Sequence, residues 1–219
     1  MAMCDAHYQF VYVDVGESGR WSDSGVFENT TFGSAFLNGK VQLPDPRPLI
    51  NDGKKMPYCI VGDEAFPLKT WIMRPYPGKS LDCVAKKVFN YRLSRARRTI
   101  ENTFGIMVSK WRILKTAIVA EPNNVVKLVK AICVLHNFLR KQSAASYTPP
   151  GSTDIVDENG QINEGSWRAE MEKATLQPIA QSSRNQTKAA LRVREDFACY
   201  FMSSEGELSW QVDYVLRTS

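Results

Sequence analysis

The fold and the function of this chain depend most on residues 86–115, KKVFNYRLSRARRTIENTFGIMVSKWRILK. Apolar residues recur along this stretch at steps of three and four, which is the period of an α-helix with one face in a core. They are Leu93, Ile100, Phe104, Met107 and Trp111, and Arg97 lies in the one longer gap between them. Nine lysines and arginines share the stretch with a single acid, Glu101. A helix with one buried face and one cationic face is typical of a nucleic-acid-binding surface.

Charge is distributed unevenly over the 219 residues. The net charge is +5, and the middle of the chain is basic whereas residues 154–172 lean acidic. This asymmetry favours a local anionic partner. Five dispersed cysteines without a Cys-x-x-Cys pair indicate reduced thiols of an intracellular protein, most of them in the core. No apolar run reaches membrane-spanning length and no secretory signal opens the chain, so we expect neither.

The residues before the basic helix read as strands, a helix and loops. Residues 1–6 and 9–15 are rich in apolar and β-branched residues around a short polar step, which predicts a β-hairpin. A helix is expected over 25–37 and a loop over 44–55. Residues 58–61 form a short apolar run that suits a buried strand, and Asp63 follows its carboxyl end. Functional groups collect at such strand ends in open α/β sheets, although position alone favours an ordinary polar turn as the explanation of Asp63.

The residues after the basic helix predict one more core helix and an extension. Residues 125–139 are apolar on most sides, so we expect a largely buried helix in which His136 is a hydrogen-bonded core residue. Residues 142–186 are polar and predict a flexible linker, in which Trp167 and Met171 can form a short docking segment. Helical periodicity returns over residues 185–202 and predicts a helix that packs back on the core or on a partner. Its shared face consists of Ala189, Val193, Phe197 and Phe201.

Carboxylates are the candidate chemical groups. Two-metal cleavage of phosphodiesters needs two or three acidic side chains that converge from different elements, and hard oxygen ligands suit Mg²⁺ or Mn²⁺. Asp63 at a strand end and Glu101 on the following helix are such a pair. The alternative for Glu101 is a solvated ion pair with Arg97, one helical turn earlier, and spacing alone favours that alternative. The chain has no Gly-rich phosphate loop, GxSxG motif or Cys/His pairing that would indicate an NTPase or a hydrolase triad.

Four segments resemble one family, the DDE superfamily endonucleases of the PIF/Harbinger transposase group, which includes domesticated Harbinger-derived nucleases of animals. They are residues 1–27 (MAMCDAHYQFVYVDVGESGRWSDSGVF), 58–68 (YCIVGDEAFPL), 97–114 (RRTIENTFGIMVSKWRIL) and 131–139 (AICVLHNFL). Their order and spacing match the family over residues 1–141. The tail segments VREDFACYF and SWQ are also similar.

The resemblance implies an RNase H-like mixed sheet flanked by helices, with a helical C-terminal extension. It also implies a triad of acids, in which Asp63 matches the second acid and Glu101 the third. Asp5 is the candidate for the first, with Asp14 and Asp23 as alternatives. The family's usual first acid lies in a GxxDGTHI-like segment that this sequence lacks. We therefore expect an N-terminally incomplete nuclease domain over 1–141 without its first core strand, the linker over 142–186, and the C-terminal helix and tail over 187–219.

The resemblance implies DNA cleavage with Mg²⁺ or Mn²⁺ as cofactor. It also implies a nuclear location with the cytoplasm as a second compartment, no membrane association, and a Myb-like DNA-binding partner protein. The DNA-binding candidates on the basic helix are Arg95, Arg97, Arg98, Lys110 and Arg112. Two alternatives stay open. One is a catalytically inactive, domesticated DNA-binding or protein-interaction module on the same scaffold. The other is a purely structural α/β interaction protein.

Overall fold

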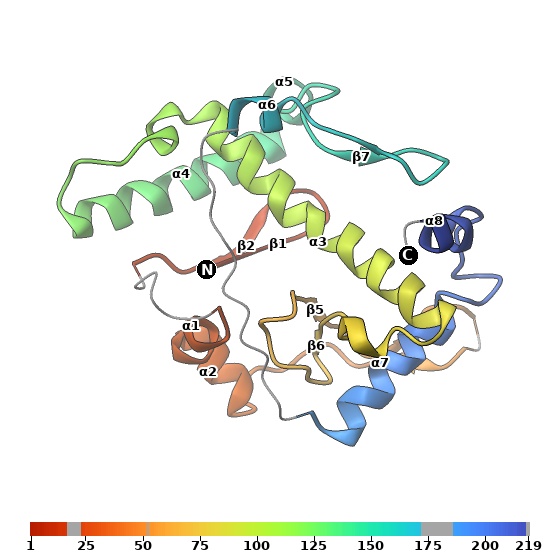
Figure 1. Cartoon of the computed structure of the whole chain (residues 1–219). Coiled ribbons are helices and arrows are strands. Elements are labelled where there is room, and N and C mark those ends of the chain that lie inside the picture. Colours follow the sequence, from red (N-terminus) through yellow and green to blue (C-terminus); the bar gives the residue numbers. More distant parts are fainter. Residues whose placement is uncertain (17–22, 52, 172–185, 218–219) are drawn as a thin grey trace. The chain divides into compact units, whose positions relative to one another are not determined.

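The structure, a computed structural model, describes residues 1–16, 23–51, 53–171 and 186–217 (Figure 1). The described residues form a mixed α/β protein whose strands make four two-stranded sheets. The chain divides into two compact units. Met1–Gly19 and Arg98–Pro178 make the first, and Arg20–Arg97 and Ile179–Ser219 make the second. Each unit is described by itself.

The longest helix, α3 (Val84–Lys110), contributes to both units and contains the basic stretch. Its predicted apolar seam is confirmed at Leu93 and Met107, which are buried, whereas Phe104 is exposed. The helix ends before Trp111, and a short 3-10 turn, η2 (Arg112–Lys115), follows it.

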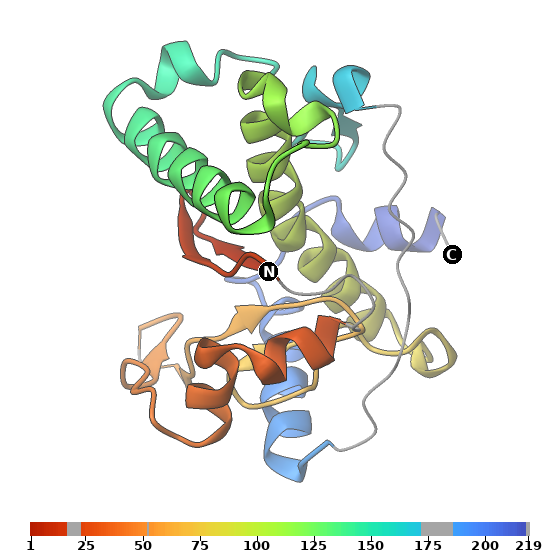
Figure 2. The same cartoon turned by 90° about the vertical axis from the view of Figure 1, so that its left-hand side faces the viewer.

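The first unit begins with the predicted hairpin, formed by the antiparallel strands β1 (Ala2–Cys4) and β2 (Phe10–Val13). Helix α4 (Pro122–Gln142) starts with a proline in its first turn, where the missing N–H costs nothing. Figure 2 shows α4 alongside the second half of α3, with the hairpin next to it. Phe10, Met107, Ile132 and Cys133 form the core between these elements.

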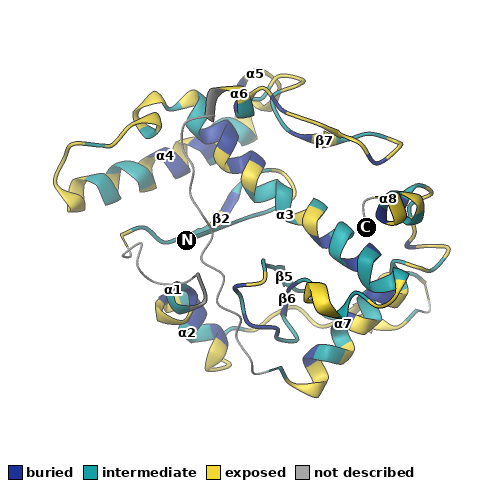
Figure 3. Ribbon diagram, viewed as in Figure 1, coloured by how far each residue is buried: buried dark blue, intermediate teal, exposed yellow. Residues whose placement is uncertain are grey.

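Helix α4 is less buried than its sequence predicts. Only Ile132, Cys133 and His136 of this helix are buried, and the side chains of Val134 and Phe138 are 67% and 57% exposed (Figure 3). The prediction of a largely buried helix was therefore wrong, because the described elements of this unit cover only one of its faces.

Three polar side chains within residues 136–140 of α4 hold the hairpin. Asn137 donates its amide to the Phe10 carbonyl and accepts from the Phe10 N–H, both at 2.7 Å. Arg140 donates to the His7 carbonyl. His136 is fully buried, and its Nε2 lies 2.7 Å from the Tyr8 carbonyl oxygen and its Nδ1 2.9 Å from the Tyr147 hydroxyl. The prediction of a hydrogen-bonded core histidine is confirmed.

Polar residues after α4 also fold. Residues 144–171 form α5 (Ala144–Tyr147), the antiparallel pair β7 (Ile155–Val156) and β8 (Ile162–Asn163), and α6 (Trp167–Met171). Composition places this segment in a flexible linker, whereas the structure gives it defined contacts. Residues 172–185 of the expected linker lie outside the described residues, and the domain boundaries of the sequence stay a prediction.

The second unit starts with two short helices where one was predicted. Helices α1 (Asp23–Asn29) and α2 (Thr31–Leu37) are separated by Thr30. Its hydroxyl donates to the Phe27 carbonyl and accepts from the Gly33 N–H, so it ends one helix and caps the next. In the expected loop, β3 (Arg47–Pro48) and β4 (Lys55–Met56) form a short antiparallel pair.

Strands β5 (Ile60–Val61) and β6 (Ile72–Met73) are parallel, and the first of them lies in the predicted strand 58–61. It is half-buried, not buried as predicted, and Tyr58 before it is exposed. A 3-10 turn, η1 (Gly78–Ser80), leads into α3, and α7 (Lys188–Tyr200) and α8 (Gln211–Arg217) close the unit. The core joins α7 to β6 and the first half of α3, so the C-terminal helix packs back on the core. It contains Leu68, Met73, Tyr76, Phe89, Leu93, Ala190 and Ala198.

The predicted inward face of α7 is only partly right. The buried residues of this helix are Ala190, Arg194 and Ala198. Val193, Phe197 and Phe201 of the predicted face are partly buried, and Ala189 is exposed.

Three broader expectations have different outcomes. The mixed α/β class is confirmed, and the RNase H-like arrangement of one sheet stays a prediction. Within the described ranges, no helix is long and apolar enough to cross a membrane. All five cysteines are free, but only Cys133 is buried and Cys83 and Cys199 are exposed, so few of them fill the core.

Candidate active site

Asp63 lies directly after β5, at the carboxyl end of a parallel strand pair. Its Oδ1 accepts a hydrogen bond from the Ala65 N–H at 2.9 Å, which makes a tight turn. Buried Arg74, just after β6, donates to the carbonyls of Glu64 and Phe66 and so holds the turn against the second strand. The predicted strand end with its acid is therefore a rigid loop in the second unit.

The Asp63 carboxylate keeps a charged partner and access to solvent. Its Oδ2 lies 3.9 Å from Nη2 of Arg97 on α3, and about a third of each side chain is exposed (31% and 32%). A carboxylate in this setting is available to a cation, because only Oδ1 is used by the turn.

Glu101 lies in the second half of α3, and its side chain is 48% exposed. Its Oε2 is 3.7 Å from Nη2 of Arg168 in α6. The ion pair that the structure gives Glu101 within the described residues is thus with Arg168, and Arg97, its predicted partner, pairs with Asp63.

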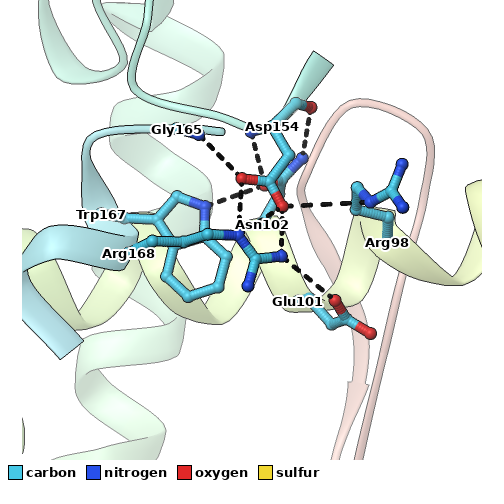
Figure 4. A network of polar contacts seen from close by, with 7 residues as sticks. All are labelled: Arg98, Glu101, Asn102, Asp154, Gly165, Trp167 and Arg168. Atoms are coloured by element: carbon cyan, nitrogen blue, oxygen red, sulfur yellow. Dashed lines mark hydrogen bonds and ion pairs between the residues drawn. The ribbon is translucent and has the colours of Figure 1, made fainter. Parts of the chain in front are cut away.

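A polar network surrounds Glu101 in the first unit (Figure 4). Asp154 lies at its centre with a fully buried side chain, which accepts from Gly165 N–H and from both Nε and Nη2 of Arg168. Arg98 Nε lies 3.9 Å from the same carboxylate. Burial alone raises the pKa of Asp154, but the hydrogen bonds from Arg168 and Gly165 outweigh it and lower the pKa below its usual value.

Asp5, the candidate first acid, has a structural role in the hairpin turn of the first unit. Its Oδ1 accepts from the N–H groups of His7 and Gln9 at 2.8 and 3.0 Å. Of the alternatives, Asp14 lies 3.5 Å from the Tyr12 hydroxyl, and the side chain of Asp23 lies outside the described residues.

The five candidate DNA-binding residues of the basic stretch are not equivalent. Arg95 stacks on the rings of Tyr91 and Trp210, and the Arg98 side chain is only 15% exposed. Lys110 and Arg112 are exposed at the end of α3. The cationic face predicted from sequence is therefore partly used for packing, and its exposed charges lie toward the C-terminal end of the helix.

Comparison with known proteins identifies the family. The family model described as DDE superfamily endonuclease matches residues 1–137, more than half of the chain. The chain belongs to the DDE superfamily endonucleases.

Relatives of this DDE endonuclease domain carry related names. "Protein ALP1-like" of Arabidopsis thaliana is 29% identical over 139 residues, which cover 63% of this chain and 34% of that protein. "Putative nuclease HARBI1" of Homo sapiens is 24% identical over 153 residues, which cover 68% of this chain and 39% of that protein. The chain thus spans between a third and two fifths of the length of these relatives. No solved structure matches.

The three predicted acids of the DDE domain fall in different units. Asp5 and Glu101 belong to the first unit and Asp63 to the second. Among the described residues there is no group of three His, Cys, Asp or Glu side chains that could hold a metal ion. Their assignment as catalytic and metal-binding residues stays a prediction.

The residues that surround Glu101 were not predicted from the sequence. Arg168 and Asp154 lie in a polar stretch without periodicity, more than fifty positions after the acid they surround. The one available signal was Trp167, an isolated tryptophan in that stretch, and its predicted docking is confirmed because it is buried and donates to Asn102 at 3.0 Å. The side chain of Met171, its predicted partner, lies outside the described residues.

Proposed function

We propose that this chain cleaves DNA phosphodiester bonds with the help of divalent metal ions. The observation that carries the proposal is the family match, which spans both Asp63 and Glu101. Each of these acids is partly exposed beside one guanidinium, as expected of a carboxylate that a metal ion must reach. The RNase H-like arrangement of the domain belongs to the same proposal.

The chemical type of these side chains suits a hard divalent cation. Carboxylate oxygens are the ligands that Mg²⁺ and Mn²⁺ prefer, and we assign Asp63 and Glu101 as ligands. Asp5 is the third candidate. When bound, the metal would supply Lewis-acid activation of the attacking oxygen and stabilise the leaving oxygen.

The chain's own cations would bind the DNA backbone. Lys110 and Arg112 are exposed after the Glu101 turn, so they can contact phosphates without losing a partner that the structure gives them. Arg97 would act through Asp63, because its guanidinium neutralises that carboxylate. Arg95 and Arg98, which pack internally, would contribute mainly to the local positive potential.

The second candidate is an inactive, domesticated DNA-binding or protein-interaction module. One observation favours it, since Asp5 uses Oδ1 to fix two backbone N–H groups of the hairpin turn. A side chain with this structural role explains its presence without catalysis.

Nicking of supercoiled plasmid DNA in Mg²⁺ or Mn²⁺ tests the proposal. We expect nicking that EDTA abolishes and that falls to the no-enzyme background in Asp63→Asn and in Glu101→Gln. Glu64→Gln is the matched control, because Glu64 is an exposed acid next to Asp63 and should leave the rate unchanged.

Each other outcome has a distinct meaning. Nicking that survives both substitutions would contradict the assigned ligands. Salt-sensitive DNA binding without any nicking would favour the inactive module. Failure to bind DNA at low salt would leave a structural interaction protein.

We also propose a nuclear location, with the cytoplasm as a second compartment, because the proposed substrate is DNA. Imaging of the fluorescently tagged chain tests this directly. The Myb-like partner is a separate prediction, on which neither the contacts nor the comparisons bear.

A further inference from the structure

The segment that carries Arg168 is seated on α3 by specific contacts of the first unit. The Asn102 side chain donates to the Asp154 carbonyl at 3.0 Å and accepts from the Asp154 N–H at 2.9 Å, as a neighbouring strand would. Trp167 packs on Gly105, where a Cβ atom would lie 2.2 Å from the indole Cδ2. The start of α6 therefore contacts Asn102 and Gly105, which follow Glu101 on α3 by one and four residues. Figure 4 shows Trp167 beside Asn102.

Contacts with Asp154 and Trp167 immobilise the Arg168 guanidinium. Its Nε and Nη2 bind the buried Asp154 carboxylate, and its Cζ lies 4.5 Å from the Trp167 ring centre. The rotamer entropy of the side chain is already lost in the folded protein, so a further contact to Arg168 costs little ordering.

One edge of the guanidinium remains available beside Glu101. The Arg168 side chain is 35% exposed and its Nη2 lies 3.7 Å from Glu101 Oε2. Within the part of the chain that the structure describes, Nη1 of Arg168 has no hydrogen-bond partner.

Two guanidiniums of the network share one buried carboxylate. Asp154 is the buried counterion of both Arg98 and Arg168, and Nη1 of Arg98 is a buried donor without a hydrogen-bond partner among the described residues. The other acids beside Arg168 are partly or fully solvated, namely Glu101, 3.7 Å from its Nη2, and the exposed Glu164. If Glu101 binds a divalent cation, the site gains positive charge that a phosphate group would neutralise.

We propose that Arg168 binds a DNA phosphate beside Glu101. The inference rests on the proposed function, because it takes the bound anion to be the backbone of the DNA that is cleaved. A planar guanidinium with one edge fixed and one edge exposed is suited to the oxygens of a phosphate. The segment 144–171 is then part of the DNA-binding surface of this unit.

Binding of a short fluorescein-labelled DNA duplex in EDTA tests the proposal without cleavage. Fluorescence anisotropy is measured between about 50 and 200 mM salt for the wild type and for Arg168→Ala. We expect a roughly tenfold loss of affinity and a shallower slope of log K against log salt, by about 0.9, as for one lost phosphate contact. Arg192→Ala is the matched control, because it removes the same charge from an exposed position on α7 and should change neither quantity to this extent.

The outcomes separate this inference from the proposed function. If the wild type does not bind DNA at low salt, the proposed function fails whatever Arg168 does. If the wild type binds and Arg168→Ala matches Arg192→Ala in affinity and slope, the phosphate contact is overturned, even where the melting temperature of Arg168→Ala falls. Should Arg168→Ala not fold, Arg168→Lys replaces it. We expect the lysine variant to keep the slope but to lose at least threefold in affinity, and wild-type affinity would overturn the proposal.

Discussion

The side chains of His136 and Asn137 form hydrogen bonds with backbone groups of the hairpin that a neighbouring strand would otherwise make. Asn137 pairs with both main-chain groups of Phe10, as the backbone of an adjacent strand would. Two buried backbone groups left without partners cost about 1–3 kcal/mol each, so this amide stabilises the edge of the hairpin substantially. The adjacent His136 and Asn137 therefore have a structural explanation within the first unit.

Burial favours the neutral form of His136 in the folded protein. If Nε2–H donates to the Tyr8 carbonyl, Nδ1 accepts from the Tyr147 hydroxyl, which in turn accepts from Trp111. Burial lowers the pKa of His136, and the Tyr8 carbonyl only partly offsets this effect. Protonation would require a charged ring inside the core.

Stability should consequently depend on pH through His136. Because its folded pKa lies below the ordinary value of about 6.5, the unfolded chain binds more protons, and the free energy of unfolding decreases as pH falls below that value. We expect a lower melting temperature at pH 5.5 than at pH 7.5. The other histidine, His7, is exposed, so His7→Gln should show the same decrease. A decrease of equal size in His136→Gln would contradict the explanation.

At the scale of elements, the contact between α3 and α6 depends on Gly105. An alanine there would gain about 1 kcal/mol of helix propensity, but its Cβ would overlap the Trp167 indole. Since overpacking costs about 1–3 kcal/mol, we expect Gly105→Ala to lower the melting temperature and to shift tryptophan emission to longer wavelength as Trp167 leaves its seat.

Two variants make this prediction specific. Gly78→Ala is the control, because no atom lies within 4 Å of a Cβ at that position. In a Trp167→Phe background, Gly105→Ala should produce no shift of the emission. An unchanged spectrum of the single variant Gly105→Ala would show that Trp167 stays buried.

The elements also show what the sequence could and could not predict. Local patterns were sufficient for α3, for the hairpin and for the strand before Asp63, because apolar periodicity and turn residues act over a few positions. They were insufficient for the break at Thr30, where a side-chain cap overrides helix propensity. They missed the 144–171 segment, whose stability comes from polar contacts such as those of Asp154 with Asn102, 52 positions away.

In the candidate site, too, residues with a local sequence signal were predicted and a residue placed by distant contacts was not. Asp63 and Glu101 were predicted from local pattern and from family resemblance together. Arg168 was not, because nothing in its neighbourhood along the chain distinguishes an arginine that reaches Glu101 from one that faces solvent.

At the scale of the whole molecule, one continuous helix belongs to both units. A proline at Ala96, which is exposed in the middle of α3, would remove one helical hydrogen bond and clash with the preceding turn, at a cost of about 3 kcal/mol or more. We expect Ala96→Pro to lower the melting temperature and to speed amide hydrogen exchange on both sides of residue 96. Ala96→Gly is the control, with an expected cost near 1 kcal/mol. Equal effects of the two substitutions would contradict a role for the continuity of α3.

The division of the chain into interleaved units also governs how it emerges from the ribosome. Phe10 meets its partner Asn137 127 positions later, so at about 5–20 residues per second the hairpin waits roughly 6–25 seconds for the side chain that pairs with it. The second unit waits a similar time, because Leu68 shares its core with Ala198, 130 positions later. All residues of the core that contains Phe10 have been made once Asn137 is added, whereas Leu68 and Phe89 still lack Ala190 and Ala198 at that point. The nascent protein therefore exposes the apolar surface of the second core after the first core has all its residues.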